Sequence, residues 1–313
     1  MDGDVLNIGS TRLKRIYHND RVTGKNDHFG TLLFDPEGRI VKVGDNQTWL
    51  YTGSRIEEEW ASYVRLFDLV TLEAAPKVQI LMPDAGERWA SVHLAIQVNP
   101  ALCVVFYSTG EVVRAALSKR PDGPFLRDPE FQLAPTEAWE EGSLESDGGF
   151  VKIEQSDDKL RIWMLYDNLG PGTSGQNGWA EVEIDCQTRR IRLVRKHPGN
   201  PIGLLLSHRL AARTGGNVSS EVRFEGQYPL FYMSKPARRE YRIGVVLSDD
   251  PLFQTVQTNQ EFDTGTLGDE TFSEKYQFYI CNDFLYLIYE LGDKDIDCRT
   301  AVRKYAFLNR ASE

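Results

Sequence analysis

Residues 149–166 read GFVKIEQSDDKLRIWMLY, and this stretch carries the pattern that decides the fold. An apolar run, 149–155, is followed by a short polar turn and by a second apolar run that ends in Tyr166. Asp, Asn and Gly tolerate the backbone of tight turns, so two β-rich runs around such a turn predict a β-hairpin. The tyrosine at the end of its second strand is the feature to look for elsewhere in the chain.

The tyrosine-ended strand recurs along the whole sequence. By subtraction of their residue numbers, the five tyrosines lie 56, 59, 66 and 57 residues apart. A repeat of this length suits a four-stranded propeller blade with its loops. The recurring segments are Trp49-Leu50-Tyr51, Val105-Phe106-Tyr107, Met164-Leu165-Tyr166, Phe231-Tyr232 and Ile288-Tyr289.

A third apolar segment follows each hairpin, and several of these segments alternate apolar and polar residues as half-solvated strands do. For residues 57–65, a short helix is an alternative to a strand. No other segment shows an apolar stripe with the helical period. The five expected third strands are 61–66, 112–117, 179–184, 241–247 and 300–308.

These units predict an all-β fold, a single five-bladed β-propeller domain over residues 1–313 with about four antiparallel strands in each blade. The last blade lacks an outer strand, and residues 11–18 are left over, so we expect this N-terminal strand to close the last blade and remove an exposed sheet edge. A β-sandwich or a two-domain all-β protein is the competing architecture, but it does not explain the near-constant spacing. The expected blades are 28–80, 87–135, 143–197, 213–256 and 270–310.

Composition excludes several classes of partner. The chain has 41% apolar and 26% charged residues, as soluble globular proteins do, and a formal net charge of −10. Because nucleic-acid binding normally needs a basic patch, and the basic residues here are scattered, we expect no nucleic-acid partner. No stretch approaches the ~20 apolar residues of a membrane helix, so no membrane partner is expected either.

The cysteines and the N-terminus favour a reducing, cytoplasmic location. The first fifteen residues, MDGDVLNIGSTRLKR, contain no apolar signal core, and the four cysteines form no CxxC pair and have no zinc-ligand spacing with histidine. The sequence has no phosphate loop, dinucleotide fingerprint, HExxH or nucleophilic triad order. We therefore expect no cofactor and no metal, and the oligomeric state stays open.

Two segments resemble the clan of five-bladed glycoside hydrolases that includes family 43. The first is Asp35-Pro36, followed by Ile40-Val41-Lys42-Val43-Gly44-Asp45 and by Thr48-Trp49-Leu50-Tyr51-Thr52-Gly53, and it is similar to that family's opening blade. The second is Leu117-Ser118-Lys119-Arg120-Pro121-Asp122-Gly123-Pro124-Phe125, which resembles the turn after a blade's third strand. Architecturally the resemblance covers most of the chain.

The resemblance implies three catalytic carboxylates, which in that family lie near the propeller axis where the innermost strands begin. Carried over by position, the first-blade base is Asp35, the third-blade carboxylate that orients the site is Asp147, and the fourth-blade acid is Glu221. The family usually has Gly-Pro or Ala-Pro after that glutamate, whereas here Glu221 falls a few residues late and no proline follows. Asn217, in the same segment, would suit a propeller that binds sugar without cleaving it.

Further residues are candidates for substrate binding. Asp27 and His28 lie just upstream of the first blade, and Asp27 replaces Asp35 as the first acid if the innermost strand is residues 29–34. Glu145 lies two residues from Asp147, so strand alternation points both the same way. Trp89 begins the second blade and either stacks on a sugar face or packs in the core.

Glycoside cleavage requires one protonated and one ionised carboxyl group, and two acids in one cavity push their pKa values apart. The resemblance therefore implies a glycoside hydrolase-like enzyme that acts on a carbohydrate through Asp35, Asp147 and Glu221. Taken singly, the segments around these residues also read as ordinary turns and strands. Two alternatives remain: a non-hydrolytic propeller that binds a carbohydrate or small molecule, and a propeller recruited to lyase or cyclase chemistry on a specialised metabolite.

Overall fold

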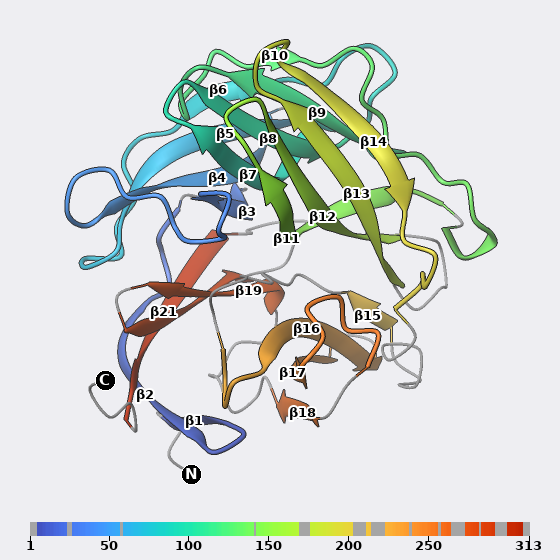
Figure 1. Cartoon of the computed structure of the whole chain (residues 1–313). Coiled ribbons are helices and arrows are strands. Elements are labelled where there is room, and N and C mark those ends of the chain that lie inside the picture. Colours follow the sequence, from blue (N-terminus) through green and yellow to red (C-terminus); the bar gives the residue numbers. More distant parts are fainter. Residues whose placement is uncertain are drawn as a thin grey trace.

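The computed structural model is built almost entirely of β-strands (Figure 1). Among the residues it describes, one 3-10 turn, η1 (Ala138–Glu140), interrupts the strands, and no helix is long and apolar enough to cross a membrane. The structure describes residues 5–23, 27–56, 59–140, 142–168, 176–202, 211–213, 223–237, 240–255, 258–263, 273–281, 283–291 and 299–308.

The strands follow one another in consecutive antiparallel units, each starting with an innermost strand. Sequential strands pair within each unit, and the strand order is β3-β4-β5-β6, β7-β8-β9-β10, β11-β12-β13-β14, β15-β16-β17-β18 and β19-β20-β21. The first two units contain β3 (Asp27–Phe34), β4 (Gln47–Ile56), β5 (Glu59–Asp68), β6 (Val78–Leu81), β7 (Ser91–Asn99), β8 (Leu102–Ser108), β9 (Val113–Ser118) and β10 (Leu126–Arg127). The others contain β11 (Leu144–Gln155), β12 (Lys159–Asn168), β13 (Asn177–Asp185), β14 (Arg190–Lys196), β15 (Ala211–Arg213), β16 (Tyr228–Ala237), β17 (Glu240–Ser248), β18 (Thr258–Asp263), β19 (Ser273–Cys281), β20 (Phe284–Leu291) and β21 (Arg299–Phe307).

The N-terminal strand closes the last unit, as the sequence predicts. β2 (Thr11–Asn19) pairs antiparallel with β21, from Leu13 opposite Phe307 to Asn19 opposite Val302. A further strand, β1 (Val5–Ile8), which the sequence pattern did not indicate, pairs with β2 and extends this sheet outward. The two ends of the chain thus share one sheet (Figure 1), which is the expected way to close a ring of blades.

The innermost strands of the first two units meet directly. β3 and β7 pair in parallel through Leu33 opposite Ala95 and Phe34 opposite Ile96, so the two units form one eight-stranded sheet. Gly30 permits this approach, because a Cβ atom built on it would lie only 2.3 Å from the carbonyl oxygen of Val92. A side chain at position 30 would therefore push the two blades apart.

The repeated tyrosines are core residues between blades. Tyr51, Tyr107, Tyr166, Tyr232 and Tyr289 are each at most 2% exposed. Several hydroxyl groups hydrogen bond to neighbouring segments: Tyr51 donates to the carbonyl of Pro121 at 2.9 Å, and Tyr166 donates to Glu140 at 2.6 Å. The repeat is visible in the sequence because each unit buries one large tyrosine ring in the core.

In the first unit, the structure confirms the expected third strand 61–66 and moves the innermost strand. Of residues 57–65, for which a short helix was the alternative, the described part, 59–65, lies in β5, whose pairing with β4 runs from Ile56 opposite Glu59 to Gln47 opposite Asp68. This long-range ladder overrides local helix propensity. The innermost strand begins at Asp27 and ends at Phe34, so Asp35 follows that strand instead of preceding it.

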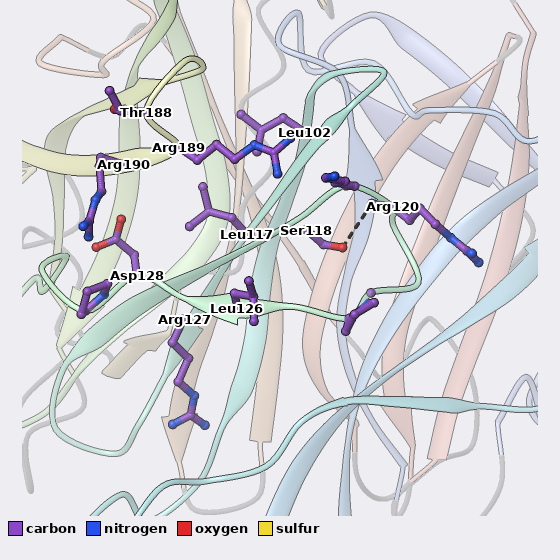
Figure 2. Close-up of a pocket in the computed structure, with 14 residues that line it drawn as sticks. Leu102, Leu117, Ser118, Arg120, Leu126, Arg127, Asp128, Thr188, Arg189 and Arg190 are labelled. Carbon is purple, nitrogen blue, oxygen red and sulfur yellow. Dashed lines mark hydrogen bonds between the residues drawn. The ribbon is translucent and has the colours of Figure 1, made fainter.

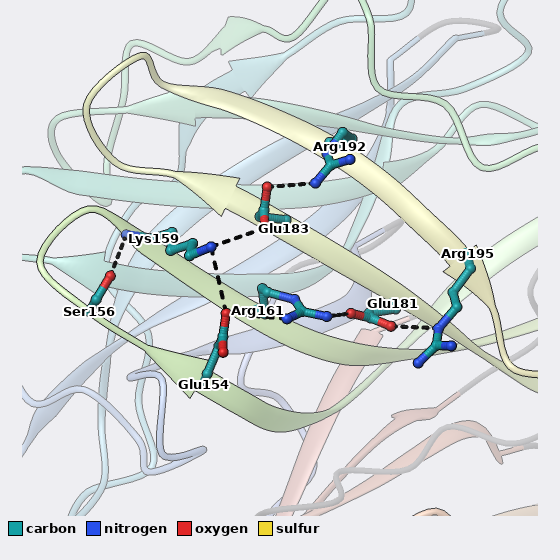
Figure 3. A network of polar contacts seen from close by, with 8 residues as sticks. All are labelled: Glu154, Ser156, Lys159, Arg161, Glu181, Glu183, Arg192 and Arg195. Atoms are coloured by element: carbon teal, nitrogen blue, oxygen red, sulfur yellow. Dashed lines mark hydrogen bonds and ion pairs between the residues drawn. The ribbon is translucent and has the colours of Figure 1, made fainter.

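A ladder of ion pairs crosses the third unit (Figure 3). The side chain of Glu181 on β13 is 1% exposed and accepts from Arg161 on β12 and from Arg195 on β14, the latter at 2.8 Å. At the more exposed end, Glu183 pairs with Arg192 at 2.9 Å. These charges tie adjacent strands together on one face of the blade.

Candidate active site

Polar and ionisable side chains from four units gather at one end of the blades. We call this set the axial cluster: Asp27 and His28 on β3, Ser91 and His93 on β7, Glu145 on β11, and Glu290 at the end of β20. The strands β3, β7, β11 and β20 are far apart in the sequence but are connected by the side-chain contacts described next.

His28 and Glu290 form a partly buried pair between the first and last units. The Nδ1 atom of His28 lies 2.9 Å from Oε2 of Glu290, whose side chain is 2% exposed. A carboxylate in this position favours the tautomer in which Nδ1 carries the proton and donates it to Glu290. The opposite ring atom, Nε2, is buried and hydrogen bonds to none of the residues that the structure describes. His28 therefore has a free acceptor held in a fixed orientation.

One tryptophan, Trp60, packs on His28, and a second, Trp89, is bridged to Trp60. The rings of His28 and Trp60 pack edge to face, with centroids 4.3 Å apart and an interplanar angle of 79°. The backbone of Trp60 forms a parallel bridge with Trp89, and the Ala90 amide donates to the Trp60 carbonyl at 2.9 Å. Both indole side chains are partly exposed. Trp89, a predicted binding residue, is thus a backbone neighbour of Trp60, and Trp60, which packs on His28, was not singled out in the sequence.

His28 is connected to the second unit through Gly53 and Ser91. A Cβ atom built on Gly53 would lie 3.9 Å from Cβ of His28 and 3.4 Å from Oγ of Ser91. The Ser91 hydroxyl is 2.8 Å from Nε2 of His93. The first and second units therefore present His28 and His93 at the same end of their innermost strands.

His93 in turn contacts the start of β11. Its Nδ1 atom lies 3.0 Å from the carbonyl oxygen of Ser146 and 3.8 Å from Oε2 of Glu145. Both ring nitrogens of His93 have partners, as expected for a strand histidine. The pairing brings Glu145, a predicted binding residue, into the axial cluster.

The backbone next to Asp147 also lies against His93. Gly148 has φ of +71°, and a Cβ atom there would lie 2.8 Å from the His93 carbonyl oxygen and 3.1 Å from Nε2 of Gln277. The β11–β12 register shifts between Ser146 and Phe150, so a bulge falls at Asp147. Bulges re-aim side chains next to functional sites. The structure describes the Asp147 backbone and not its side chain.

Asp27 is buried in a network of hydrogen bonds and ion pairs within the first unit. Its Oδ1 atom accepts from Ser54 and from Nζ of Lys77 at 2.7 Å, and Oδ2 accepts from Arg65 at 2.6 Å. Its side chain is 3% exposed. Two cations and a hydroxyl surround the Asp27 carboxylate and fix the start of β3 against β4 and β5.

The structure places Asp35 at the opposite end of β3 from the axial cluster. Its carboxylate caps the turn that follows the strand, accepting from the Arg39 backbone amide at 2.9 Å and from Arg39 Nε at 2.7 Å. The neighbouring Glu37 pairs with Lys152, near the far end of β11. Because β3 begins at Asp27, the sequence-based alternative in which Asp27 replaces Asp35 agrees with the geometry.

Two other predicted residues, Glu221 and Asn217, lie outside the described residues.

The strand start that carries Glu145 holds a second acid that sequence reasoning missed. Asp167 on β12 is 2% exposed and stands directly opposite Glu145 in the β11–β12 register. The register thus places two acidic residues at facing positions on these two strands. The sequence signal of Asp167 is its place directly after Tyr166, one of the repeated tyrosines.

Glu290 and Trp60 carried no sequence signal either. Glu290 follows the last repeated tyrosine, Tyr289, yet only the closure of the fold brings it to His28. Among the described residues, no group of three or more His, Cys, Asp or Glu side chains has the arrangement of a metal site.

No protein-family model and no curated protein sequence matches this chain. Solved structures do match it over nearly its whole length. A family 117 glycoside hydrolase from Zobellia galactanivorans aligns with a TM-score of 0.55 at 11% identity, covering 96% of this chain and 92% of that one. The chain has the fold of the β-propeller glycoside hydrolases.

Two more structures agree with this fold. An endo-arabinase from Bacteroides thetaiotaomicron aligns with a TM-score of 0.52 at 12% identity over 95% of this chain and 99% of that one. A protein of unknown function from Dyadobacter fermentans aligns with a TM-score of 0.53 at 6% identity over 94% and 99%. In this propeller, the axial cluster is where residues from sequence-distant blades meet.

Proposed function

We propose that this protein is a glycosidase that binds a carbohydrate at the axial cluster and cleaves a glycosidic bond there. The observation that carries the proposal is the convergence of His28, His93, Glu145 and Glu290 from four strands at one end of a propeller. The family 117 glycoside hydrolase and the endo-arabinase that share the fold support the same reaction class. Fold alone does not fix function, so the proposal rests on the cluster.

The reaction needs a proton donor on the leaving oxygen and an ionised carboxylate opposite it. In the proposal, Asp147 and Glu145 on β11 supply carboxylates for the reaction, and Asp27 takes the first-blade position in place of Asp35. Glu221 stays the proposed proton donor on the basis of the family resemblance. Glu145 and Asp167, which stand opposite each other in the β11–β12 register, place two acidic residues at this end of the third unit.

His28 is the proposed binding residue for a sugar hydroxyl. Since Glu290 accepts from Nδ1, the buried Nε2 atom is left to accept a hydrogen bond from substrate. The partly exposed rings of Trp60 and Trp89 supply the apolar surface on which a sugar face packs.

The direct test is turnover on a panel of aryl glycosides and plant and algal polysaccharides. Release of reducing sugar measures turnover, and calorimetry measures binding. Release of reducing sugar supports the proposal. Saccharide binding without any turnover across the panel would reassign the protein to the non-hydrolytic binding class.

A Glu290→Gln variant is expected to lower kcat/KM on the best substrate of that panel by about 10- to 100-fold, because it removes the charge that orients His28 and misplaced groups cost this much. Most of the loss should appear in KM if His28 binds substrate in the ground state. Glu73→Gln, at an exposed glutamate, is the matched control and should be unaffected. Unchanged kinetics in the folded Glu290 variant would remove His28 from the site.

A further inference from the structure

A groove of about 570 Å³ lies at the rim of the second and third units (Figure 2). Its floor and sides include Leu102, Leu117, Pro124 and Leu126, and its volume falls within the ~300–1,000 Å³ of small-ligand sites. Leu126 is 74% exposed, an unusual exposure for a large apolar side chain that has no partner surface.

The groove is at the other end of the blades from the axial cluster. β8 begins at Leu102, and its opposite end, Ser108, pairs with Ser91 of the axial cluster. β13 likewise begins opposite Asp167 and ends at Asp185, immediately before the turn that borders the groove. A ligand in the groove therefore occupies a site distinct from the proposed active site.

The groove is cationic although the protein is acidic. Five basic residues line it against one acid, Asp128, while the chain as a whole has a net charge of −10. The Asp128 carboxylate is occupied, because Oδ1 accepts from the amides of Glu130 and Phe131 and Oδ2 accepts from the amide of Ile191 at 2.9 Å. Asp128 thereby joins the two blades and holds the walls of the groove together. The basic residues are Lys119, Arg120, Arg127, Arg189 and Arg190.

Three of these cations already have acidic partners outside the groove lining. Arg120 pairs with Asp122, Arg127 with Asp84 and Glu87, and Arg190 with Glu130. Lys119 and Arg189 make no ion pair or side-chain hydrogen bond with any residue that the structure describes. The charge available to a ligand is therefore theirs.

Arg189 also has an unfavourable backbone conformation. Its φ is +54°, a region in which glycine is favoured and a long side chain costs free energy. The turn is fixed by Asp185, whose Oδ1 accepts from the amides of Gln187 and Thr188 at 2.9 and 2.7 Å. Glycine would relieve the strain, so an arginine here suggests that its side chain is used.

We propose that the groove is an anchoring site for a carboxylated oligosaccharide, with Arg189 and Lys119 binding its carboxylates and the leucines packing against its sugar rings. The assignment to a sugar rests on the proposed function. Charge complementarity selects the acidic kind, because the rest of a surface with net charge −10 repels such a polymer and the groove attracts it. Guanidinium groups bind carboxylates through paired N–H donors.

The test is calorimetric titration with tri-galacturonic acid and with neutral xylotriose, on the Asp147→Asn protein so that no probe is consumed. Tri-galacturonic acid should bind and weaken as salt is raised, and xylotriose should bind at least ~10-fold more weakly at this site. Arg189→Gly should lower the affinity for tri-galacturonic acid by about 10-fold or more while leaving Tm unchanged or raised by ~1–2 °C. Arg192→Gln, which removes an exposed arginine outside the groove, should change neither.

Equal affinity of the parent protein and Arg189→Gly would overturn the proposal, as would binding of a hexaglutamate peptide without binding of the glycan. The two proposals fail separately. Hydrolysis by the wild-type protein without groove binding would contradict only the anchoring site. Groove binding without hydrolysis of any glycoside would contradict only the proposed enzymatic activity.

Discussion

Replacing Asp147 with asparagine is expected to lower kcat/KM for glycoside hydrolysis by ~10²- to 10⁴-fold, the range that a positioned acid or base contributes. The residue sits in β11 between Ser146, whose carbonyl contacts His93, and Gly148, which lies against the His93 carbonyl and Gln277. Asparagine keeps the size of the side chain and removes its charge and its proton chemistry. The loss should therefore appear in kcat, with the fold unchanged.

The matched control is Asp157→Asn, at the exposed turn of the same β11–β12 hairpin. It makes the same chemical change at the opposite end of the strands and should retain full activity. Thermal unfolding of both variants should coincide with that of the wild type. Wild-type kcat/KM in Asp147→Asn would rule out the role proposed for this residue.

Replacing Glu140 with alanine is expected to reduce the free energy of unfolding by about 3–5 kcal/mol, the usual cost of removing one partner from a buried ion pair. Glu140 is 0% exposed. Its carboxylate accepts from Lys196, from the Tyr166 hydroxyl at 2.6 Å, and from the backbone amides of Thr136 and Glu137 at 2.6 and 2.9 Å. Alanine would leave the Lys196 ammonium without its carboxylate.

Glu140 also gives this stability a pH dependence. Burial by itself would raise the pKa of the Glu140 carboxyl, but the hydrogen bonds from Lys196, Thr136 and Tyr166 outweigh burial and lower the pKa from its usual value of 4.5. A lowered folded-state pKa means that the contribution is present above about pH 4.5 and is lost as the pH falls through the folded-state value. Urea denaturation between pH 7 and pH 3 should show a smaller acid-induced loss in Glu140→Ala than in the wild type.

Glu183→Gln serves as the comparison for the Glu140 experiment. Glu183 pairs with the exposed Arg192 in the ladder of Figure 3, and exposed pairs contribute about 0–1 kcal/mol. If Glu140→Ala and Glu183→Gln lowered the free energy of unfolding equally, the buried contacts of Glu140 would contribute no more to stability than an exposed ion pair does.

The Glu140 cluster connects the stability of the fold to the candidate active site. Tyr166, which donates to Glu140, pairs with Ser146 in the β11–β12 register. Ser146 in turn contacts His93 through its carbonyl. Loosening Glu140 is therefore expected to move the strand start that carries Glu145 and Asp147, and the stability variant should also lose activity.

The fold was readable from the sequence because its signal is local and repeated. Each repeated tyrosine, such as Tyr51 and Tyr166, is buried between blades, and each hairpin turn needs residues that tolerate its backbone, as Glu225 and Gly226 do with φ of +54° and +82°. The leftover segment 11–18 predicted the closure of the last blade for a simple reason: a sheet edge needs a partner strand.

The candidate site was only partly readable. Asp27, His28 and Glu145 were singled out and belong to the axial cluster, and Trp89 was singled out and is bridged to Trp60, which packs on His28. Asp35 was predicted to precede the innermost strand of the first blade. That strand is β3, which ends at Phe34, so Asp35 lies at the end of β3 away from the axial cluster. Sequence spacing along one strand gives no information about which end faces the other blades.

By itself, the sequence determined the number and order of the hairpins, the residues that fill the interfaces between blades, and the strand that closes the ring, since these depend on periodicity and turn chemistry within short windows. Only the tertiary structure decided that Glu290 orients His28, that His93 meets Glu145, and that Arg189 faces a groove. Those contacts join residues far apart in the chain, and they exist only after the blades have packed around one centre.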